Sequence, residues 1–221
     1  YSRLSEQNQI WVGMAKETAH QLGTPISSLM AWGVYFKEKY VEEPYIKELD
    51  KDVKRLEIIT QRFSSIGSAP KMESLNIYEQ VKSSVDYLKT RISKKVTINF
   101  TAQGAEYLSI NMNPELFSWV LENLIKNAVD AMAGVGHIQI SMSCSVVDKL
   151  MIDIEDQGNG IAPNKMSKVF KPGFTTKNRG WGLGLTLTKR IIEDYHGGRI
   201  FIKNSALNKG TAFRIILNTN A

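Results

Sequence analysis

The stretch Ala19-His20-Gln21-Leu22-Gly23-Thr24-Pro25 decides how the first part of the chain is interpreted. It lies inside a segment, residues 4–39, whose apolar spacing predicts one long helix. Pro25 has no N–H to donate to the carbonyl of Gln21, so the helix is expected to bend here. Gly23 weakens the same turn by about 1 kcal/mol relative to alanine. Two helix breakers beside a histidine indicate a functional segment rather than a purely structural helix.

Two rows of mostly apolar residues at seven-residue spacing define the packing face of this helix. One row has positions 4, 11, 18, 25 and 32, and the other has positions 22, 29 and 36, a pattern typical of a coiled coil. His20 lies two residues from Thr18 and two from Leu22, about 200° around the helix from each. The side chain of His20 is therefore expected to face solvent. It is a candidate phosphoacceptor only if the chain also holds a phosphoryl donor; without one, an ordinary surface or core histidine is the better interpretation.

A second amphipathic helix is predicted from Pro44, a residue well suited to a helix start, to about Ile66. Its apolar residues recur every three or four positions, so the two helices form a hairpin. One hairpin cannot bury both apolar stripes. Residues 1–67 are therefore expected to form a homodimer, a four-helix bundle made by two copies.

Small residues and a proline over residues 64–70 predict a hinge, with residues 68–70 as the boundary. Residues 71–221 have the pattern of an α+β domain. Helices are expected at about 78–92, 114–132 and 183–195, and strands near 75 and over 96–101, 107–112, 137–147, 150–156, 199–204 and 211–217. Strands 137–147 and 150–156 are expected to pair antiparallel.

Composition limits the classes of partner. The chain has 221 residues, of which 43% are hydrophobic, enough for two modest cores. Its single cysteine, Cys144, excludes an internal disulfide and suits a reducing compartment. The net charge of +6 is scattered, and the densest basic cluster, residues 89–95, has no interleaved aromatic residue. We therefore expect a solvated helix end there, and no nucleic-acid partner.

The sequence has no run of 18 apolar residues and no signal peptide, so a soluble, cytoplasmic segment is expected. It begins at Tyr1 rather than at a methionine, which suggests a fragment. A sensor region or membrane anchor would then lie upstream, and this segment would be the cytoplasmic portion of a membrane protein.

Two asparagines on the predicted helix 114–132 are the first candidate ligands. Asn123 and Asn127 are four residues apart and share one face of the helix. Amide oxygens are hard ligands, so Asn127 could hold a Mg²⁺ that also binds phosphates. Such a pair of asparagines also arises often by chance.

The second candidate is the run Asp156-Gln157-Gly158-Asn159-Gly160 at the end of a predicted strand. The carboxylate of Asp156 can accept a hydrogen bond from the amine of adenine, whereas guanine has an oxygen acceptor at that position. Gly158 and Gly160 would let the backbone approach the ring closely. An acidic residue followed by two glycines is, on its own, more often a turn.

A glycine run, Gly180-Trp181-Gly182-Leu183-Gly184-Leu185, leads directly into a predicted helix. Backbone N–H groups at such a helix start can bind an anion, although short glycine runs give many false matches. The basic residues Lys177 and Arg179 precede the run on a loop and could face phosphates.

Taken in order, these motifs make the chain resemble the catalytic core of a sensor histidine kinase of a two-component system. The His-x-x-x-Thr-Pro box, the paired asparagines, Asp-x-Gly-x-Gly, Phe-Lys-Pro-Gly-Phe and the glycine box follow the order of that family, and the resemblance covers essentially the whole chain. It implies a helical hairpin followed by the two-layer α+β sandwich shared with gyrase-type ATPases. It also implies two cofactors, ATP and Mg²⁺, and a response regulator receiver domain as partner.

The resemblance assigns a role to each candidate residue. It makes His20 the phosphoacceptor, Asn127 the Mg²⁺ ligand with Asn123 beside it, and Asp156 the group that reads adenine, with Thr211 nearby. The residues expected to face the phosphates are Lys177, Arg179, Gly180, Gly182, Leu183 and Gly184. The hydroxyl of Thr24, one turn after His20, could orient a water to dephosphorylate the partner, or could simply bond back to a helix carbonyl.

Three positions depart from the family pattern. Gln21 stands where an acidic residue usually follows the phosphoacceptor; its amide can accept a hydrogen bond from the imidazole but adds no charge, which predicts slower phosphorylation. Asp130 stands where many kinases have a basic residue, so Lys177 and Arg179 would have more charge to neutralise. Trp181 is bulkier than the usual residue of the glycine box and could cover the nucleotide or pack on the loop.

Two other functions fit parts of the pattern. A gyrase-type ATPase needs a general base near the γ-phosphate, and Asn123 cannot serve as one, while Glu122 is about 100° away around the helix. A nucleotide-binding scaffold that relays signals without phosphorylating itself is favoured only by Gln21. The sequence therefore favours a histidine kinase.

Overall fold

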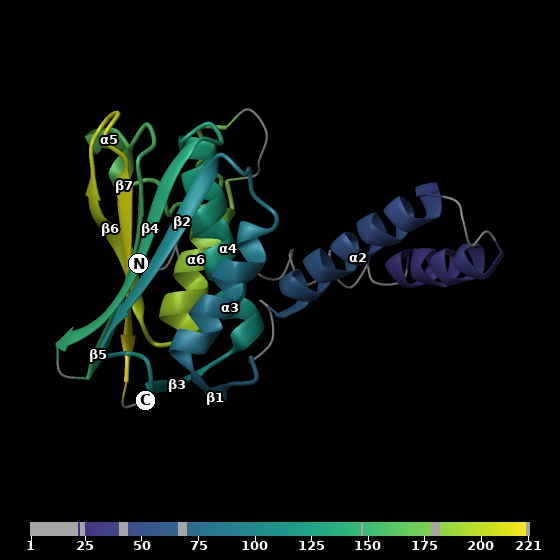
Figure 1. Ribbon diagram of the computed structural model, residues 1–221, viewed down its shortest axis with the longest axis horizontal. Coiled ribbons are helices and arrows are strands. Elements are labelled where there is room, and N and C mark those ends of the chain that lie inside the picture. The colour runs from purple at the N-terminus through teal and green to yellow at the C-terminus, as the bar shows by residue number, and fades with distance from the viewer. Residues whose placement is uncertain are drawn as a thin grey trace. The chain divides into compact units, whose positions relative to one another are not determined.

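The computed structural model describes residues 22, 25–39, 44–65, 70–146, 148–177 and 182–219. The chain divides into two compact units, residues 1–70 and 71–221, which are described separately (Figure 1). Among the described residues, no helix combines the length and the apolar character needed to cross a bilayer.

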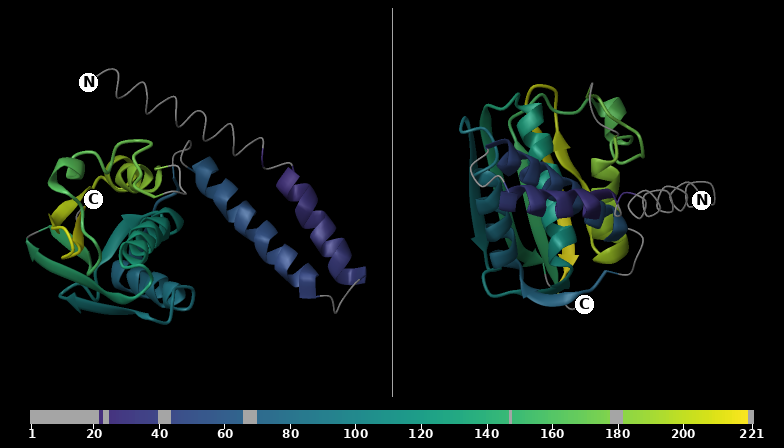
Figure 2. Two further views of the ribbon diagram at one scale, coloured as in Figure 1. Left: turned by 90° about the horizontal axis from the view of Figure 1, so that it is seen from above. Right: turned by 90° about the vertical axis from the view of Figure 1, so that its right-hand side faces the viewer.

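The first unit is a pair of helices. One is helical over residues 25–39, and the other is α2 (Pro44–Ser65), which begins at the proline as predicted; the two lie side by side (Figure 2). Lys37 of the first helix contacts Asp50 of α2 at 2.6 Å, and Lys54 contacts the same carboxylate at 3.1 Å. These two hydrogen-bonded lysines lower the pKa of Asp50.

Only part of the apolar surface of this helix pair is covered within one copy. Ile26 and Val53 are buried, with 6% and 4% of their surface exposed. Leu22, Leu29 and Trp32, which belong to the predicted heptad rows, are 46%, 42% and 55% exposed. The described residues therefore carry an apolar stripe that the hairpin leaves open.

The second unit is a five-stranded mixed sheet in the order β2-β4-β5-β7-β6, with helices on one face, and a separate two-stranded sheet of β1 and β3 (Figure 1). The strands are β1 (Glu73–Asn76), β2 (Val96–Gln103), β3 (Ser109–Met112), β4 (Gly136–Val146), β5 (Lys149–Asp156), β6 (Arg199–Ser205) and β7 (Thr211–Asn218). The helices are α3 (Ile77–Lys89), α4 (Pro114–Ala131), α5 (Pro163–Met166), α6 (Gly184–Arg190) and the π-helix η1 (Ile191–Tyr195).

Strand pairing follows the alternation of apolar and polar residues. β4 and β5 pair antiparallel with Ile140 opposite Ile154, as predicted, and β2 pairs parallel to β4 with Ile98 opposite Ile138. All four of these side chains are buried. Since each large aliphatic side chain buried in this way contributes about 1.5–3 kcal/mol, this face fixes the register of the sheet.

Capping residues fix both long helices of this unit. The side chain of Asn76 accepts a hydrogen bond from the backbone N–H of Glu79 at the start of α3. Asn113 does the same for Leu116 at the start of α4, where Pro114 occupies the first turn. Removing such a cap costs about 1 kcal/mol. The apolar side of α4 covers the sheet with Phe117, Leu121, Leu124 and Ile125, all fully buried.

Two predicted boundaries are corrected by local contacts. The helix predicted over 78–92 ends at Lys89, because Thr90 caps it through a side-chain bond to the carbonyl of Tyr87. The strand predicted over 107–112 begins only at Ser109, because Leu108 closes a turn with Ala105.

The single helix predicted over 183–195 is α6 followed by a wider π-helical turn. The cause is His196, whose backbone N–H and ring Nδ1 both bond the carbonyl of Ile191, at 3.2 and 2.7 Å. Two bonds to one carbonyl five residues back favour the π turn over a regular last α turn.

The other face of the large sheet is polar. Thr97 bonds the Nδ1 of His137 at 2.9 Å, and Asn99 bonds Gln139 at 2.9 Å, in each case across the β2–β4 pair. On β5, Asp153 is 5% exposed and receives two bonds of 2.7 Å from Arg214 and one of 2.7 Å from Lys203. Burial raises the pKa of Asp153, but the bonds from Arg214 and Lys203 outweigh it, so its pKa lies below the usual value.

Asp153→Ala is expected to lower the free energy of unfolding at pH 7 by about 3 kcal/mol, because it leaves the partly buried cation of Arg214 without its partner. The lowered pKa means that the wild-type carboxylate stabilises the fold above about pH 4 and loses that effect as the pH falls through its folded-state pKa. Urea unfolding at pH 7 and at lower pH measures both effects. The matched control is Asp86→Ala, a 57%-exposed carboxylate paired with lysines at 3.9 Å, which should cost less than about 1 kcal/mol.

Candidate functional site

On the exposed side of the last turns of α4, two side chains bond the same lysine. The ammonium of Lys177 lies 2.9 Å from Oδ1 of Asn127 and 2.5 Å from Oδ2 of Asp130. Asn127 and Asp130 are three residues apart on α4, so both oxygens face the same side of the helix. The structure thus brings together Asn127 and Lys177, two of the predicted site residues. It also pairs Lys177 with Asp130, the position that departs from the family pattern.

Asn123 lies one turn earlier on α4. Its side-chain oxygen is the nearest atom to the place where a Cβ on Gly184 would lie, 3.6 Å away. Its Nδ2 is buried and has no hydrogen-bond partner among the described residues. An unpaired buried donor costs about 1–3 kcal/mol, which makes this amide a candidate for contact with a ligand.

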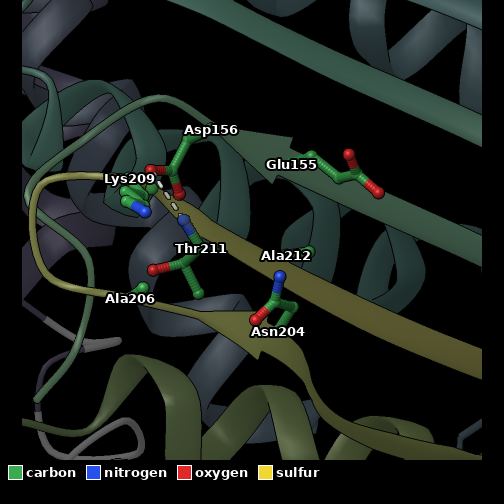
Figure 3. Close-up of a pocket in the computed structure, with 8 residues that line it drawn as sticks. Glu155, Asp156, Asn204, Ala206, Lys209, Thr211 and Ala212 are labelled. Atoms are coloured by element: carbon green, nitrogen blue, oxygen red, sulfur yellow. Dashed lines mark hydrogen bonds between the residues drawn. The ribbon is translucent and has the colours of Figure 1, made fainter.

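Asp156 ends β5, and two backbone donors hold its carboxylate. The N–H of Gly158 donates to Oδ1 at 2.8 Å. The N–H of Thr211 on β7 donates to the same oxygen at 3.3 Å, the bond drawn in Figure 3. Burial raises the pKa of Asp156, and these two backbone bonds oppose the rise only in part. The side chain is therefore fixed in direction, and protonation is easier than for an exposed aspartate.

The two glycines of the Asp156–Gly160 run are required by close backbone packing. A Cβ on Gly158 would lie 2.7 Å from the carbonyl oxygen of Ala131, the last residue of α4, and Asn159 donates to that same oxygen at 3.1 Å. Gly160 has φ +68°, and a Cβ there would overlap the carbonyl of Ala206. The run therefore lies between α4 and the β6–β7 turn. It connects Asp156 with the end of α4 that carries Asn127 and Asp130.

A shallow pocket of about 150 Å³ opens beside Asp156 (Figure 3). Its lining residues are Glu155, Asp156, Asn204, Ala206, Lys209, Gly210, Thr211 and Ala212. The pocket includes two predicted nucleotide residues, Asp156 and Thr211, but neither asparagine of α4.

Ser205 is a supporting residue that sequence reasoning missed. Its hydroxyl donates to the carbonyl of Gly210 at 3.1 Å, accepts from the N–H of Ile161 at 2.8 Å and lies 2.9 Å from the hydroxyl of Thr211. A serine before a turn is too common to be a signal by itself. Only the pairing of β6 with β7 brings it to Thr211.

The described part of the glycine box packs against the preceding loop. Gly182 has φ +65°, and a Cβ there would lie 2.7 Å from the carbonyl oxygens of both Gly173 and Phe174. Leu183 precedes α6, and Gly184 begins it next to Asn123. Phe170 of the same loop packs edge-to-face on Phe213, with 6.2 Å between ring centres.

Five predicted site residues lie outside the described part of the chain: His20, Gln21, Thr24, Arg179 and Gly180. Trp181, the third departure from the family pattern, also lies outside it. Their roles stay predictions.

Comparison with known proteins matches residues 112–221, about half of the chain, to the family described as histidine kinase-, DNA gyrase B-, and HSP90-like ATPase. The sensor histidine kinase ZraS of Salmonella typhimurium is 32% identical over 211 residues, which are 92% of this chain and 45% of that protein. Sporulation kinase C of Bacillus subtilis is 27% identical over 222 residues, 98% of this chain and 51% of that protein. The chain spans about half the length of the curated relatives it matches.

Solved structures show the same architecture. The catalytic domain of the histidine kinase ThkA is 29% identical, with a TM-score of 0.60 over 67% of this chain and 95% of that one. ThkA in complex with the response regulator TrrA is 24% identical, with a TM-score of 0.61 over 99% of this chain and 64% of that one. The predicted fold class, helices followed by an α+β sandwich, is confirmed; the dimeric bundle stays a prediction.

The second unit is therefore an ATP-binding domain of the class that includes histidine kinases, gyrase B and HSP90. Because similarity to sensor histidine kinases extends over more than nine-tenths of the chain, the chain belongs to that family and corresponds to its catalytic core.

Proposed function

We propose that this chain transfers the γ-phosphoryl group of ATP to His20 and then to an aspartate on the receiver domain of a response regulator. One observation carries the nucleotide part: the carboxylate of Asp156, fixed by Gly158 and Thr211, belongs to a run whose Asn159 N–H bonds the carbonyl of Ala131 at the end of α4, the helix that carries Asn127. The residue proposed to bind adenine and the residue proposed to hold the metal at the phosphates thus belong to connected parts of one domain.

Asp156 would read the adenine. Both backbone donors use Oδ1, which leaves Oδ2 to accept from the exocyclic amine of adenine. Guanine presents an acceptor at that position and would be repelled. Thr211, fixed through Ser205, would line the same part of the site.

The donor set on α4 fits a Mg²⁺ that arrives with the phosphates. Asn127 offers a hard amide oxygen, and a cation, the ammonium of Lys177, already lies against it. When bound, the metal would supply positive charge for the phosphate oxygens. Lys177, Arg179 and the residues of the glycine box would add the protein's own donors.

At the acceptor, the imidazole of His20 would attack in its neutral form, because only the neutral ring has a nitrogen with a free lone pair. Its Nε2 lone pair forms the N–P bond while the bond from the γ-phosphorus to the bridging oxygen breaks, and ADP leaves with that electron pair. Gln21 would accept from Nδ1–H and orient the ring. Thr24 would orient a water in a separate reaction, in which the water attacks the acyl phosphate of the response regulator, the aspartate leaves as a carboxylate and inorganic phosphate is released.

Hydrolysis is disfavoured as the main activity. The carboxylate nearest to Asn123 in sequence, Glu122, bonds Lys126 at 2.6 Å. A carboxylate held by an ammonium is a weaker base, and Asn123 itself cannot remove a proton from water.

Incubation of the chain with ATP labelled at the γ-phosphate tests the proposal. A histidine kinase gives labelled protein whose label is lost in acid and kept in alkali, because the N–P bond is acid-labile. Release of free phosphate without labelled protein would indicate an ATPase, and neither product would indicate a scaffold. ATP labelled at the α-phosphate is the matched control and should leave the protein unlabelled.

A dimer is expected from the open stripe of the helical unit. Sedimentation should give twice the monomer mass of 24.9 kDa at micromolar concentration. Trp32→Glu should shift the chain towards monomer, since it places a charge at a 55%-exposed position of the stripe. Residues 71–221 alone should be monomeric and should still bind ATP. A monomeric full chain at that concentration would contradict the dimer.

Nucleotide binding is expected to fall with acid at an unusually high pH. Because burial raises the pKa of Asp156, its carboxylate becomes protonated, and stops accepting from adenine, at a higher pH than an ordinary aspartate with a pKa of about 3.9. Titration of a fluorescent ATP analogue between pH 8 and pH 4 measures this loss. Asp156→Asn should bind weakly and lack this titration; a wild-type midpoint at the ordinary aspartate value would contradict the role of burial.

A further inference from the structure

Lys177 is held by two oxygens of different chemistry. Its ammonium bonds the neutral amide oxygen of Asn127 and the charged carboxylate of Asp130. The side chains of Lys177 and Asp130 are 43% and 56% exposed, so neither is locked in place by packing. An exposed pair of this kind adds little to the stability of the fold. Its two charges can, however, act on charged ligands that bind nearby.

The carboxylate of Asp130 opposes any polyphosphate brought to Asn127. Both residues face the same side of α4, one turn apart, so a phosphate chain near Asn127 lies close to the negative charge of Asp130. Lys177 cancels that charge in the structure. It cannot stay on Asn127 when this amide binds a metal, since the oxygen is then occupied and a divalent ion repels the ammonium.

Two positive charges are therefore available for one carboxylate. Lys177, once released from Asn127, can turn to the phosphates, and Asp130 then needs another cation. A divalent ion held by Asn127 would be one helical turn from Asp130 and could supply that positive charge. Without that ion, Lys177 must serve either Asp130 or the phosphates, and one of them stays unpaired.

We propose that Asp130 sets the metal dependence of nucleotide binding: its carboxylate holds Lys177 in the nucleotide-free state, penalises ATP that arrives without a divalent cation, and faces that cation when it binds at Asn127. This role rests on the proposed ATP site. It makes Asp130 a specificity-determining residue that selects metal-bound ATP over free ATP.

The test is the dissociation constant of a fluorescent ATP analogue for the full chain, measured in excess Mg²⁺ and again in EDTA. The ratio of the EDTA value to the Mg²⁺ value reports metal dependence without any turnover. Asp130→Asn, a substitution of similar shape, is expected to lower this ratio about fivefold to tenfold, mainly through tighter binding in EDTA.

Two further variants identify the cause. Glu122→Gln removes another carboxylate that is paired with a lysine on α4, Lys126, and does not belong to the group formed by Asn127, Asp130 and Lys177. The ratio of the two dissociation constants for this variant should stay within about twofold of wild type. In the background of Lys177→Gln, Asp130→Asn should still lower the ratio, because the carboxylate acts on the metal and not only through Lys177.

An Asp130→Asn ratio equal to wild type would overturn the inference, as would an effect that disappears in the Lys177→Gln background. The first result would mean that the Lys177–Asp130 pair has no effect on nucleotide binding. The second would mean that Asp130 acts only by holding Lys177. Failure of the wild-type chain to bind the analogue in either buffer would overturn the proposed function and the inference with it. Binding with an unchanged ratio overturns the inference alone.

Discussion

His20→Ala is expected to abolish phosphoryl incorporation completely and to leave the dissociation constant for ATP within about twofold of wild type. The proposed acceptor belongs to the helical unit and the proposed nucleotide site to the other, so the two functions should separate. Asn127→Ala is also expected to abolish incorporation, but through the nucleotide site. It removes the amide oxygen that is proposed to hold Mg²⁺ and that bonds the ammonium of Lys177 in the structure. Labelled ATP and an equilibrium binding assay, run on both variants, measure the two functions.

The chain offers matched histidine controls. It has three histidines, His20, His137 and His196. His196 is 9% exposed, and both ring nitrogens are engaged: Nδ1 with Ile191 and Nε2 with the N–H of Asn113. Burial lowers its pKa, with the two backbone bonds opposing. Phosphorylation of Nε2 would break the bond to Asn113 at the start of α4, and phosphorylation of Nδ1 would break the bond to Ile191. His137→Ala, on the polar face of the sheet, should incorporate label as the wild type does. Loss of label in this variant, or label kept in His20→Ala, would contradict the assignment of His20.

Most of the fold could be predicted because its signals are local. Alternating apolar residues define β4 and β5, and Pro114 after Asn113 begins α4 as its sequence indicates. The π turn could not be predicted, since it depends on His196 reaching Asn113, 83 residues away, and on the carbonyl of Ile191. A helical periodicity pattern contains no information about such a contact.

For the candidate site, the sequence motifs propose residues, and only the structure gives the contacts among those that it describes. Sequence motifs identified Asp156, Asn127 and Lys177. They did not reveal that Lys177 binds Asp130, because those residues are 47 positions apart and only the described loop brings them together. The acidic residue at position 130 predicts more charge for Lys177 and Arg179 to neutralise, and in the structure Lys177 pairs directly with Asp130.

The glycine before Thr211 is the point at which the two halves of the candidate site depend on one backbone. Gly210 has φ +85°, and a Cβ there would overlap the carbonyl oxygen of Asp156. Its N–H donates to the carbonyl of Gly158 at 2.9 Å, and its own carbonyl accepts from Ser205. Any side chain at this position must therefore separate the end of β5 from the start of β7, where Thr211 donates to Asp156.

Gly210→Ala is accordingly expected to lower the free energy of unfolding by about 4 kcal/mol, the sum of an unfavourable φ and a backbone overlap that no rotamer relieves. ATP affinity should fall at least about thirtyfold in the fraction that folds, because Asp156 loses its fixed direction. Urea unfolding and nucleotide titration measure the two effects.

The matched control is Gly104→Ala, which also has a positive φ, +70°, but no atom within 4 Å of the added Cβ. It should cost only about 1–2 kcal/mol and leave ATP affinity unchanged. Equal losses of stability in the two variants would show that the overlap with Asp156 is relieved at no cost, and that Gly210 serves only its turn.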